Sequence, residues 1–314
     1  PVYNAENFIQ QAIESVIDQK HVTEVVMVND NSTDGSVEII REFQKSNPII
    51  RLIEHEFDYN VGAGKARNIG IKASRNEWLA FLDVDDYYYD NRFENTARII
   101  QENTDADGVY EAVENVFENN AAYTRFMAAH PRFIAENKTD YKHTLFTMYK
   151  TVEPSRLFNA LLEGDKGFFH FNGLLVKKNL VIKVGMLNSE LELFQDIDLF
   201  MKLAMIGELH PGQLENPVAA RMVHSNNRVY GNNVKLKYYR LKSLSQLEAF
   251  AIKMLANKEV INIIEMNNIK TCSSELMNWN IYQFFRLKYA IIKRIYRKKF
   301  KQFLEKEKAI NNFN

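Results

Sequence analysis

The sequence predicts an α/β fold in which helices flank a mostly parallel sheet, followed by a helical C-terminal extension. Short apolar runs alternate with longer amphipathic stretches from residue 5 to about residue 113. Such alternation is typical of right-handed crossovers between parallel strands. After Gly231 the chain contains neither Pro nor Gly, which favours helix over residues 234–314.

The elements are expected in a regular order. Apolar residues on one helical face predict a first helix over residues 8–17, and a short apolar run predicts a strand over residues 24–28. Asp34 is a suitable N-cap for a second helix. The elements predicted after it are a strand at 51–54, a helix at 62–73, a strand at 78–82, a helix at 91–103 and a strand at 107–113.

Residues 114–170 have a less regular pattern, rich in Asn, Tyr, His and Phe, and are expected to form a variable surface segment. Regular structure is predicted to return with a strand at 169–176 and a helix at 196–206. We therefore expect one α/β domain over residues 1–233, followed by a helical, basic extension over residues 234–314.

The composition is that of an ordinary globular protein: 46% of the 314 residues are hydrophobic, 25% are charged, and 40 basic residues balance 40 acidic ones. This balance gives no reason to expect a nucleic-acid partner. The single cysteine, Cys272, excludes an intramolecular disulfide, and no Cys or His cluster suggests a zinc site. No apolar run is long enough to span a membrane, no signal peptide is recognisable, and the start at Pro1 indicates a fragment.

Polar clusters follow three of the predicted strands. They are Asn29-Asp30-Asn31, Asn60-Val61-Gly62, and the FLDVDD turn with Asp83, Asp85 and Asp86. Because ligands bind beyond the carboxyl ends of parallel strands, these clusters are expected at one site. Carboxylate oxygens suit Mg²⁺ or Mn²⁺ shared with a substrate diphosphate, and the charge of such a cation removes the repulsion between the carboxylates. An acid-rich turn without a ligand is the alternative.

The segment NVGAGKARNIG, residues 60–70, has the character of an anion site. Its glycines allow close backbone approach, and Lys65 and Arg67 supply positive charge near the start of a helix. The segment matches neither of the two standard glycine-rich phosphate motifs. A glycine-rich helix entry with surface cations is therefore the alternative.

Four segments of residues 1–86 stand in a recognisable order and spacing: PVYNAENFIQQAIESVIDQ, VMVNDNSTDGS, NVGAGKARNIGIKAS and FLDVDD. In this arrangement the chain resembles glycosyltransferase family 2. The resemblance implies a GT-A fold with a Rossmann-like nucleotide-binding half. It also implies an inverting glycosyltransferase, of hexosyl or N-acetylhexosaminyl type. Such an enzyme uses a nucleotide-diphospho-sugar, most often a UDP-sugar, with a divalent metal, Mn²⁺ or Mg²⁺. The resemblance also implies a β-strand ahead of Pro1, so the sheet is expected to lack one strand.

The resemblance implies roles for individual residues. Those implied to bind the nucleotide-sugar are Pro1, Tyr3 and Glu6 at the base pocket, Asp30 at the base, Asn60, Gly62, Lys65 and Arg67 near the phosphates, and Asp83 at the ribose. Those implied to bind the metal are Asp85 as the principal ligand, Asp83, and His224. For Asp86, a turn or helix-capping role is the alternative. Arg221 and Arg228 are further phosphate candidates, with an ordinary surface loop as the alternative.

Residues 173–209 resemble the acceptor-side segment of the same family, in which a Glu-Asp pair opens a helix. Here the pair is Gln195-Asp196. The resemblance makes Asp196 the expected catalytic base, which takes the proton of the acceptor hydroxyl. Asp198 is the competing candidate, and a simple N-cap role for Asp196 is the alternative.

Residues 286–304 are basic, with no acidic residue and with apolar side chains at roughly helical spacing. Such a helix can lie on an anionic membrane surface, and packing of its apolar stripe onto the catalytic domain is the alternative. We expect a cytoplasmic protein, peripheral on the inner face of the plasma membrane, that glycosylates a glycan, lipid-linked or polymer acceptor in bacterial cell-surface polysaccharide or glycolipid biosynthesis. A non-catalytic nucleotide-sugar or glycan-binding module of the same fold, and a nucleotidyltransferase, are the rival functions.

Overall fold

The computed structural model describes residues 1–129, 143–164, 166–224, 233–254 and 264. The chain divides into two compact units, residues 1–257 and residues 258–314. All elements described below lie in the first unit. The predicted basic segment 286–304 lies outside the described residues.

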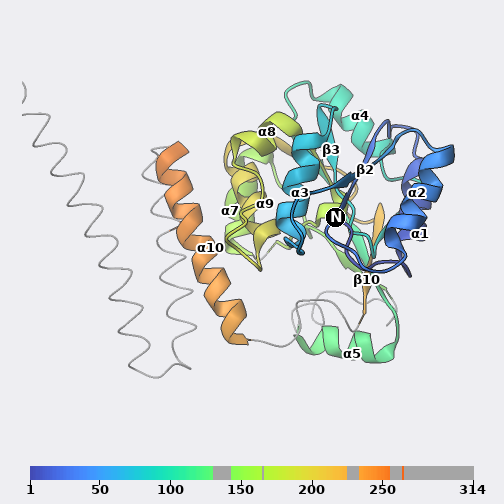
Figure 1. The fold of residues 1–314 in the computed structure, drawn as a ribbon. Coiled ribbons are helices and arrows are strands. Elements are labelled where there is room, and N and C mark those ends of the chain that lie inside the picture. The colour runs from blue at the N-terminus through green and yellow to red at the C-terminus, as the bar shows by residue number, and fades with distance from the viewer. Residues whose placement is uncertain (130–142, 165, 225–232, 255–263, 265–314) are drawn as a thin grey trace, which may run out of the picture. The chain divides into compact units, whose positions relative to one another are not determined.

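The N-terminal half follows the predicted alternation. Its elements are α1 (Ile9–Ile17), β1 (Val25–Asn29), α2 (Ser36–Ser46), β2 (Ile50–Glu54) and α3 (Ala63–Ala73). β1 and β2 pair in parallel from Val25 opposite Ile50 to Asn29 opposite Glu54. Ile9 and Ile13 of α1, Met27 of β1 and Ile40 of α2 are buried in one core cluster that fixes these layers. Figure 1 shows α1 and α2 on one side of the strands.

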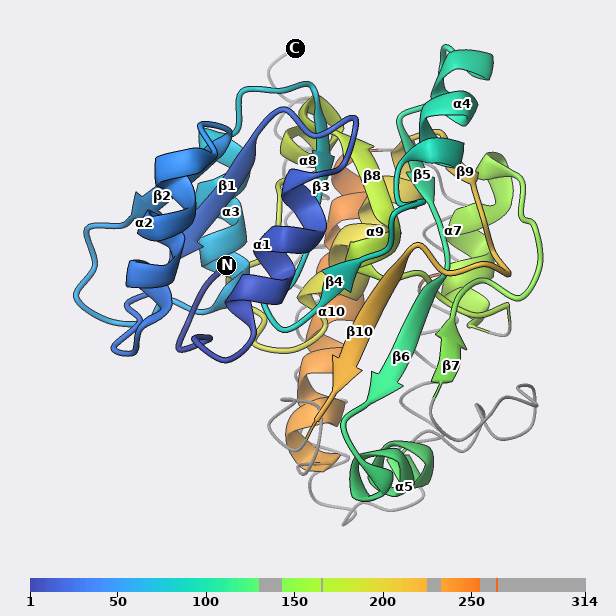
Figure 2. The ribbon, with the colours of Figure 1, turned by 90° about the vertical axis from the view of Figure 1, so that its right-hand side faces the viewer.

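Two further sheets complete the fold. One has the order β3-β8-β5-β9, formed by Trp78–Ala80, Leu174–Lys177, Gly108–Tyr110 and Leu209–Pro211. The other has the order β4-β10-β6-β7, formed by Tyr87–Tyr88, Ala219–Val223, Val113–Phe117 and His143–Phe146, which lie side by side in Figure 2. The predicted α/β class is confirmed. The pairing is mixed rather than mostly parallel, because β8 runs antiparallel to both β3 and β5, and β10 pairs antiparallel with β4 but parallel with β6.

The remaining helices surround these sheets. They are α4 (Glu94–Glu102), α5 (Asn120–Ala129), α7 (Pro154–Glu163), the 3₁₀ turn η1 (Phe171–Gly173), α8 (Lys178–Lys183), α9 (Gln195–Ile206) and α10 (Asn233–Met254). The strand expected from residue 169 begins only at Leu174, after η1. Gly173 allows this close packing, because a side chain there would collide with the carbonyl group of Glu111.

The described part of residues 114–170 has more regular structure than its sequence pattern suggests. It contains most of β6, α5, β7 and α7. Polar residues inside the sheet hide the strands from the sequence pattern: Asn115 of β6 is buried and donates from Nδ2 to Thr144 Oγ1 of β7 at 3.1 Å. A buried, satisfied polar pair breaks the hydrophobic alternation on which strand prediction depends.

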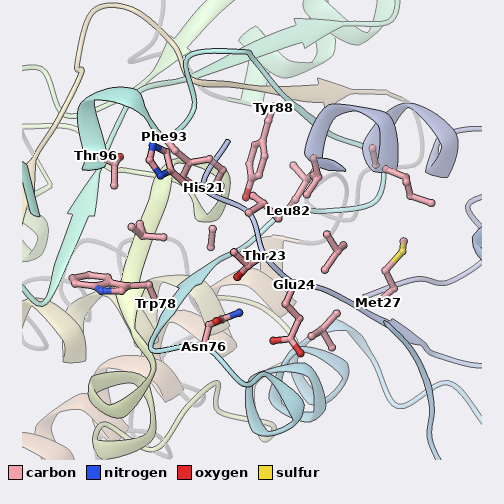
Figure 3. Close-up of a pocket in the computed structure, with 18 of the residues that line it drawn as sticks. His21, Thr23, Glu24, Met27, Asn76, Trp78, Leu82, Tyr88, Phe93 and Thr96 are labelled. Carbon is pink, nitrogen blue, oxygen red and sulfur yellow. The ribbon is translucent and has the colours of Figure 1, made fainter. Parts of the chain in front are cut away.

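A pocket of about 600 Å³ lies between β1 and β3. Met27 and Trp78 stand on opposite sides of it in Figure 3. Among the described strands, β1 pairs only with β2, and β3 pairs only with β8, so the facing edges of β1 and β3 have no strand between them. Val2 begins a parallel pairing with β1, since its N–H donates to Val28 O at 2.8 Å.

Helix α10 packs against α9 and the loop that precedes α9. Lys242 Nζ donates to the carbonyl oxygen of Glu190 at 2.7 Å, and Asn188 Nδ2 donates to Gln246 Oε1 at 2.7 Å. Leu247 and Ala251 of α10 are 1% and 0% exposed. Helix α10 belongs to the compact unit of residues 1–257. The domain boundary expected after residue 233 stays a prediction. No helix in the described ranges is long and apolar enough to cross a membrane.

Candidate active site

The acidic turn after β3 gathers three carboxylates. Ligand oxygens of Asp83, Asp85 and Asp86 all lie within 4.8 Å of one another. The turn is closed by the N–H of Asp86, which donates to the carbonyl oxygen of Asp83 at 3.0 Å. Burial and the charges of Asp85 and Asp83 raise the pKa of Asp86 well above its usual range. The chain therefore holds these groups together against their mutual repulsion.

Arg67 on α3 offsets part of this negative charge. Its guanidinium forms an ion pair with Asp83 and lies over the ring of Phe171, 4.8 Å from the ring centroid. Burial is the largest single influence and opposes the ionisation of Asp83. The charge and the hydrogen bond of Arg67, together with other positive charge nearby, nevertheless lower the pKa of Asp83 to about 2. Lys65, the other cation expected near the phosphates, is exposed on α3.

Asp85 faces His224, which follows β10. His224 Nε2 lies 3.0 Å from Asp85 Oδ2, and the imidazole stacks on the ring of Phe8 at 5.5 Å and 18°. The two residues expected to share a metal are thus in contact, although they are far apart in the chain. A carboxylate, an imidazole and the neighbouring Asp83 are donors that fit Mn²⁺ or Mg²⁺. Arg221 donates to Asn115 Oδ1 at 3.1 Å, and Arg228 lies outside the described residues.

Asp30 anchors the glycine-rich loop. Its carboxylate is 2% exposed and accepts from the N–H of Val61 at 2.7 Å and of Gly62 at 2.9 Å. His55 Nε2 lies 3.0 Å from Asp30 Oδ1, and Asn60 Nδ2 donates to the Asp30 carbonyl at 3.4 Å. Gly62 has φ of +87°, which a glycine adopts without strain. Sequence reasoning missed His55, although its place at the carboxyl end of β2 is a usable signal.

The first six residues border the same region. Pro1 lies near Arg67 and the three aspartates 30, 83 and 85. Tyr3 is 45% exposed. Glu6 is exposed and accepts at Oε2 from the N–H of Gly35 at 2.9 Å. The structure thus gives Glu6 a contact that fastens the entry of α1 to the start of α2.

Asp196 lies in the first turn of α9, close enough to Arg67 and Asp83 for their charges to act on it. Burial is the largest influence on the carboxyl group of Asp196 and raises its pKa. The charge of Arg67 lowers this pKa, and the charge of Asp83 raises it. Its Oδ1 accepts from the N–H of Ile197 at 2.9 Å. The N-cap position itself is taken by Phe194, so the N-cap interpretation of Asp196 is wrong.

The two candidates for the base, Asp196 and Asp198, differ in their contacts. Asp198 is fully buried and accepts from Lys202 Nζ at 2.6 Å, so its carboxylate is used inside the core. Gln195, which stands where the related family has Glu, donates from Nε2 to the carbonyl of Leu191. A side chain at Gly64 would collide with Gln195, so α9 packs closely on the start of α3.

Comparison with known proteins shows which family the N-terminal part of this chain matches. Residues 1–153 match the family described as Glycosyl transferase family 2. These residues belong to glycosyltransferase family 2. A relative from Rickettsia felis, an uncharacterized glycosyltransferase, is 28% identical over 213 residues, which is 67% of this chain and 31% of the relative. The chain therefore spans less than a third of that relative's length.

Solved structures share the fold. TarS residues 1–349 of S. aureus in complex with UDP-GlcNAc has a TM-score of 0.62 at 17% identity, covering 87% of this chain and 71% of that chain. The mannosyltransferase PcManGT of Pyrobaculum calidifontis, in complex with GDP-Man and Mn²⁺, has a TM-score of 0.52 at 15% identity, covering 95% and 79%. The expected GT-A fold is confirmed.

Proposed function

We propose that this chain is an inverting glycosyltransferase that transfers a hexosyl or N-acetylhexosaminyl group from a UDP-sugar to an acceptor hydroxyl. One observation carries the proposal: the acidic turn with Arg67 and the carboxylate of Asp196 border the same site from different elements. The family match and the solved neighbours in complex with UDP-GlcNAc or GDP-Man support a nucleotide-sugar donor.

The residues that would hold a divalent metal are Asp85 with His224, together with Asp83. When bound, such a cation neutralises the charge of the leaving diphosphate. Arg67 contributes positive charge to the same region, and Asp30 holds the glycine-rich loop in position through the N–H groups of Val61 and Gly62. Preorganised charges of this kind act without reorganisation at the moment of reaction.

Asp196 is proposed to be the general base. The acceptor oxygen forms a bond to the anomeric carbon while the bond from that carbon to the phosphate oxygen breaks on the opposite face. The nucleoside diphosphate leaves with the electron pair of the broken bond, and Asp196 takes the proton of the acceptor hydroxyl. Such a base contributes on the order of 10²–10⁴-fold in rate.

The donor is tested by a thermal-shift panel of UDP-, GDP-, CDP- and dTDP-sugars with Mn²⁺, followed by assay of sugar release. We expect UDP-sugars to raise the unfolding temperature, and we expect slow hydrolysis of the bound donor that stops when EDTA removes the metal. Binding without turnover across a set of acceptors contradicts the enzyme and favours a non-catalytic nucleotide-sugar-binding module.

The acceptor is proposed to be lipid-linked or a growing envelope polymer, because residues 286–304 are basic and interspersed with apolar residues. This segment is proposed to hold the protein on anionic lipid. Liposomes with anionic lipid should retain the full chain better than a chain ending at residue 284, with neutral liposomes as the control. Equal retention of both chains contradicts membrane binding by this segment.

A further inference from the structure

Asp86 is the one member of the acidic turn that is closed off by protein donors on both of its oxygens. It is 3% exposed. Oδ2 accepts from Asn172 Nδ2 at 2.7 Å, and Oδ1 accepts from the N–H of Met222 at 2.7 Å. By contrast, the side chain of Asp85 is 29% exposed and faces His224. These contacts give Asp86 a different task from that of Asp85.

The two partners of Asp86 come from segments that each carry a residue of the site. Met222 lies on β10, two residues before His224, whose ring is 3.0 Å from Asp85. Asn172 lies in η1 beside Phe171, over which Arg67 is placed at 4.8 Å. Within the described residues, Asn172 Oδ1 is buried without a hydrogen-bond partner, so the amide is held through Nδ2.

We propose that Asp86 is a positioning residue: it fastens β10 and η1 to the acidic turn, and thereby sets His224 against Asp85 and Phe171 beneath Arg67. This inference rests on the proposed function for its catalytic meaning. Both partners of Asp86 are donors, so the position needs an acceptor on each side. A carboxylate provides two, whereas an asparagine presents its N–H₂ group to one of the two donors.

A swap of the two side chains separates positioning from metal ligation. In Asp86→Asn alone, the new N–H₂ group faces one of the two donors, Asn172 Nδ2 or the N–H of Met222, so one hydrogen bond is lost. In the double variant Asp86→Asn with Asn172→Asp, the new amide at position 86 can accept from the N–H of Met222 and donate to the new carboxylate at position 172. Both hydrogen bonds are then restored, but no carboxylate remains at position 86. Asn172→Ala, which leaves the acidic turn unchanged, is the third variant.

Two measurements are made on the full chain. The ¹⁵N–¹H resonances of the His224 imidazole, recorded without metal or sugar, report whether His224 keeps its place. Calorimetric titration of Mn²⁺ in the presence of UDP reports the metal affinity. We expect Asp86→Asn and Asn172→Ala to shift the His224 resonances and to weaken Mn²⁺ binding about 10–100-fold, as loss of an outer-shell partner does, and the swap to restore both.

The proposal is overturned if the swap restores neither readout, because the two hydrogen bonds would then not be what holds His224 in place. It is also overturned if Asp86→Asn leaves both readouts unchanged. Should Asp86→Asn not fold, the comparison of Asn172→Ala with the swap decides in the same way. If the unaltered protein binds no Mn²⁺, the metal-dependent part of the proposed function fails, while the His224 resonances still decide the role of Asp86.

Discussion

Replacing Asp196 with asparagine is expected to lower the rate of sugar transfer by about 10²–10⁴-fold while UDP-sugar binding persists. The amide cannot take the proton of the acceptor hydroxyl, but it keeps the size of the carboxylate and its hydrogen bond from Ile197. Single-turnover transfer and calorimetric UDP binding are the two measurements. Asp105→Asn, at an exposed position ahead of β5, is the control and should leave both unchanged.

The same variant is expected to be more stable than the unaltered protein at neutral pH. Burial raises the pKa of Asp196, so the folded state binds this proton more tightly than the unfolded chain does. The stability linked to the group is therefore present below the unfolded pKa and is lost as the pH rises through the folded value. The gain in unfolding temperature should be present at pH 7 and disappear in acid below the unfolded pKa.

Unchanged turnover in Asp196→Asn contradicts the assignment of Asp196 as the general base.

Replacing Asp85 with alanine is expected to abolish the Mn²⁺ dependence of UDP binding. Loss of an outer-shell partner already weakens metal binding about 10–100-fold, so loss of the principal ligand should cost at least as much. Metal-free UDP binding should instead become slightly tighter, because one negative charge near the diphosphate is removed.

Calorimetric titration of UDP with Mn²⁺ and with EDTA separates these two effects. Asp105→Asn again serves as the control, since it removes the same charge at an exposed position ahead of β5. An Asp85→Ala protein that keeps the full Mn²⁺ dependence would falsify the role of Asp85 as the principal ligand.

The parts of the site that follow strands were predictable, because ligands of α/β folds bind beyond the carboxyl ends of the strands. Asp30 follows β1 and the acidic turn follows β3, and the structure brings both to Arg67 and Pro1. The role of Asp86 was not predictable, since its partners Asn172 and Met222 are 86 and 136 residues away in the chain. Sequence spacing carries no information on such pairings.

The antiparallel pairings in the two larger sheets also could not be predicted from the hydrophobic pattern of the sequence. Strand prediction assumes that buried positions are apolar, and the buried Asn115–Thr144 pair violates that assumption between β6 and β7. The choice between Asp196 and Asp198 likewise needed coordinates. Both lie in the first turn of α9, but only Asp198 is buried against a lysine of its own helix.

Helix α10 has a practical consequence for anyone preparing this protein. A chain cut at residue 233 would uncover the apolar surface that Leu247 and Ala251 cover, and would leave Glu190 and Asn188 without Lys242 and Gln246. Such a preparation should precipitate readily. The segment that leads into α9 would also lose the contacts that hold it in place. Trimming for expression or crystallisation therefore belongs after residue 257, where the compact unit ends.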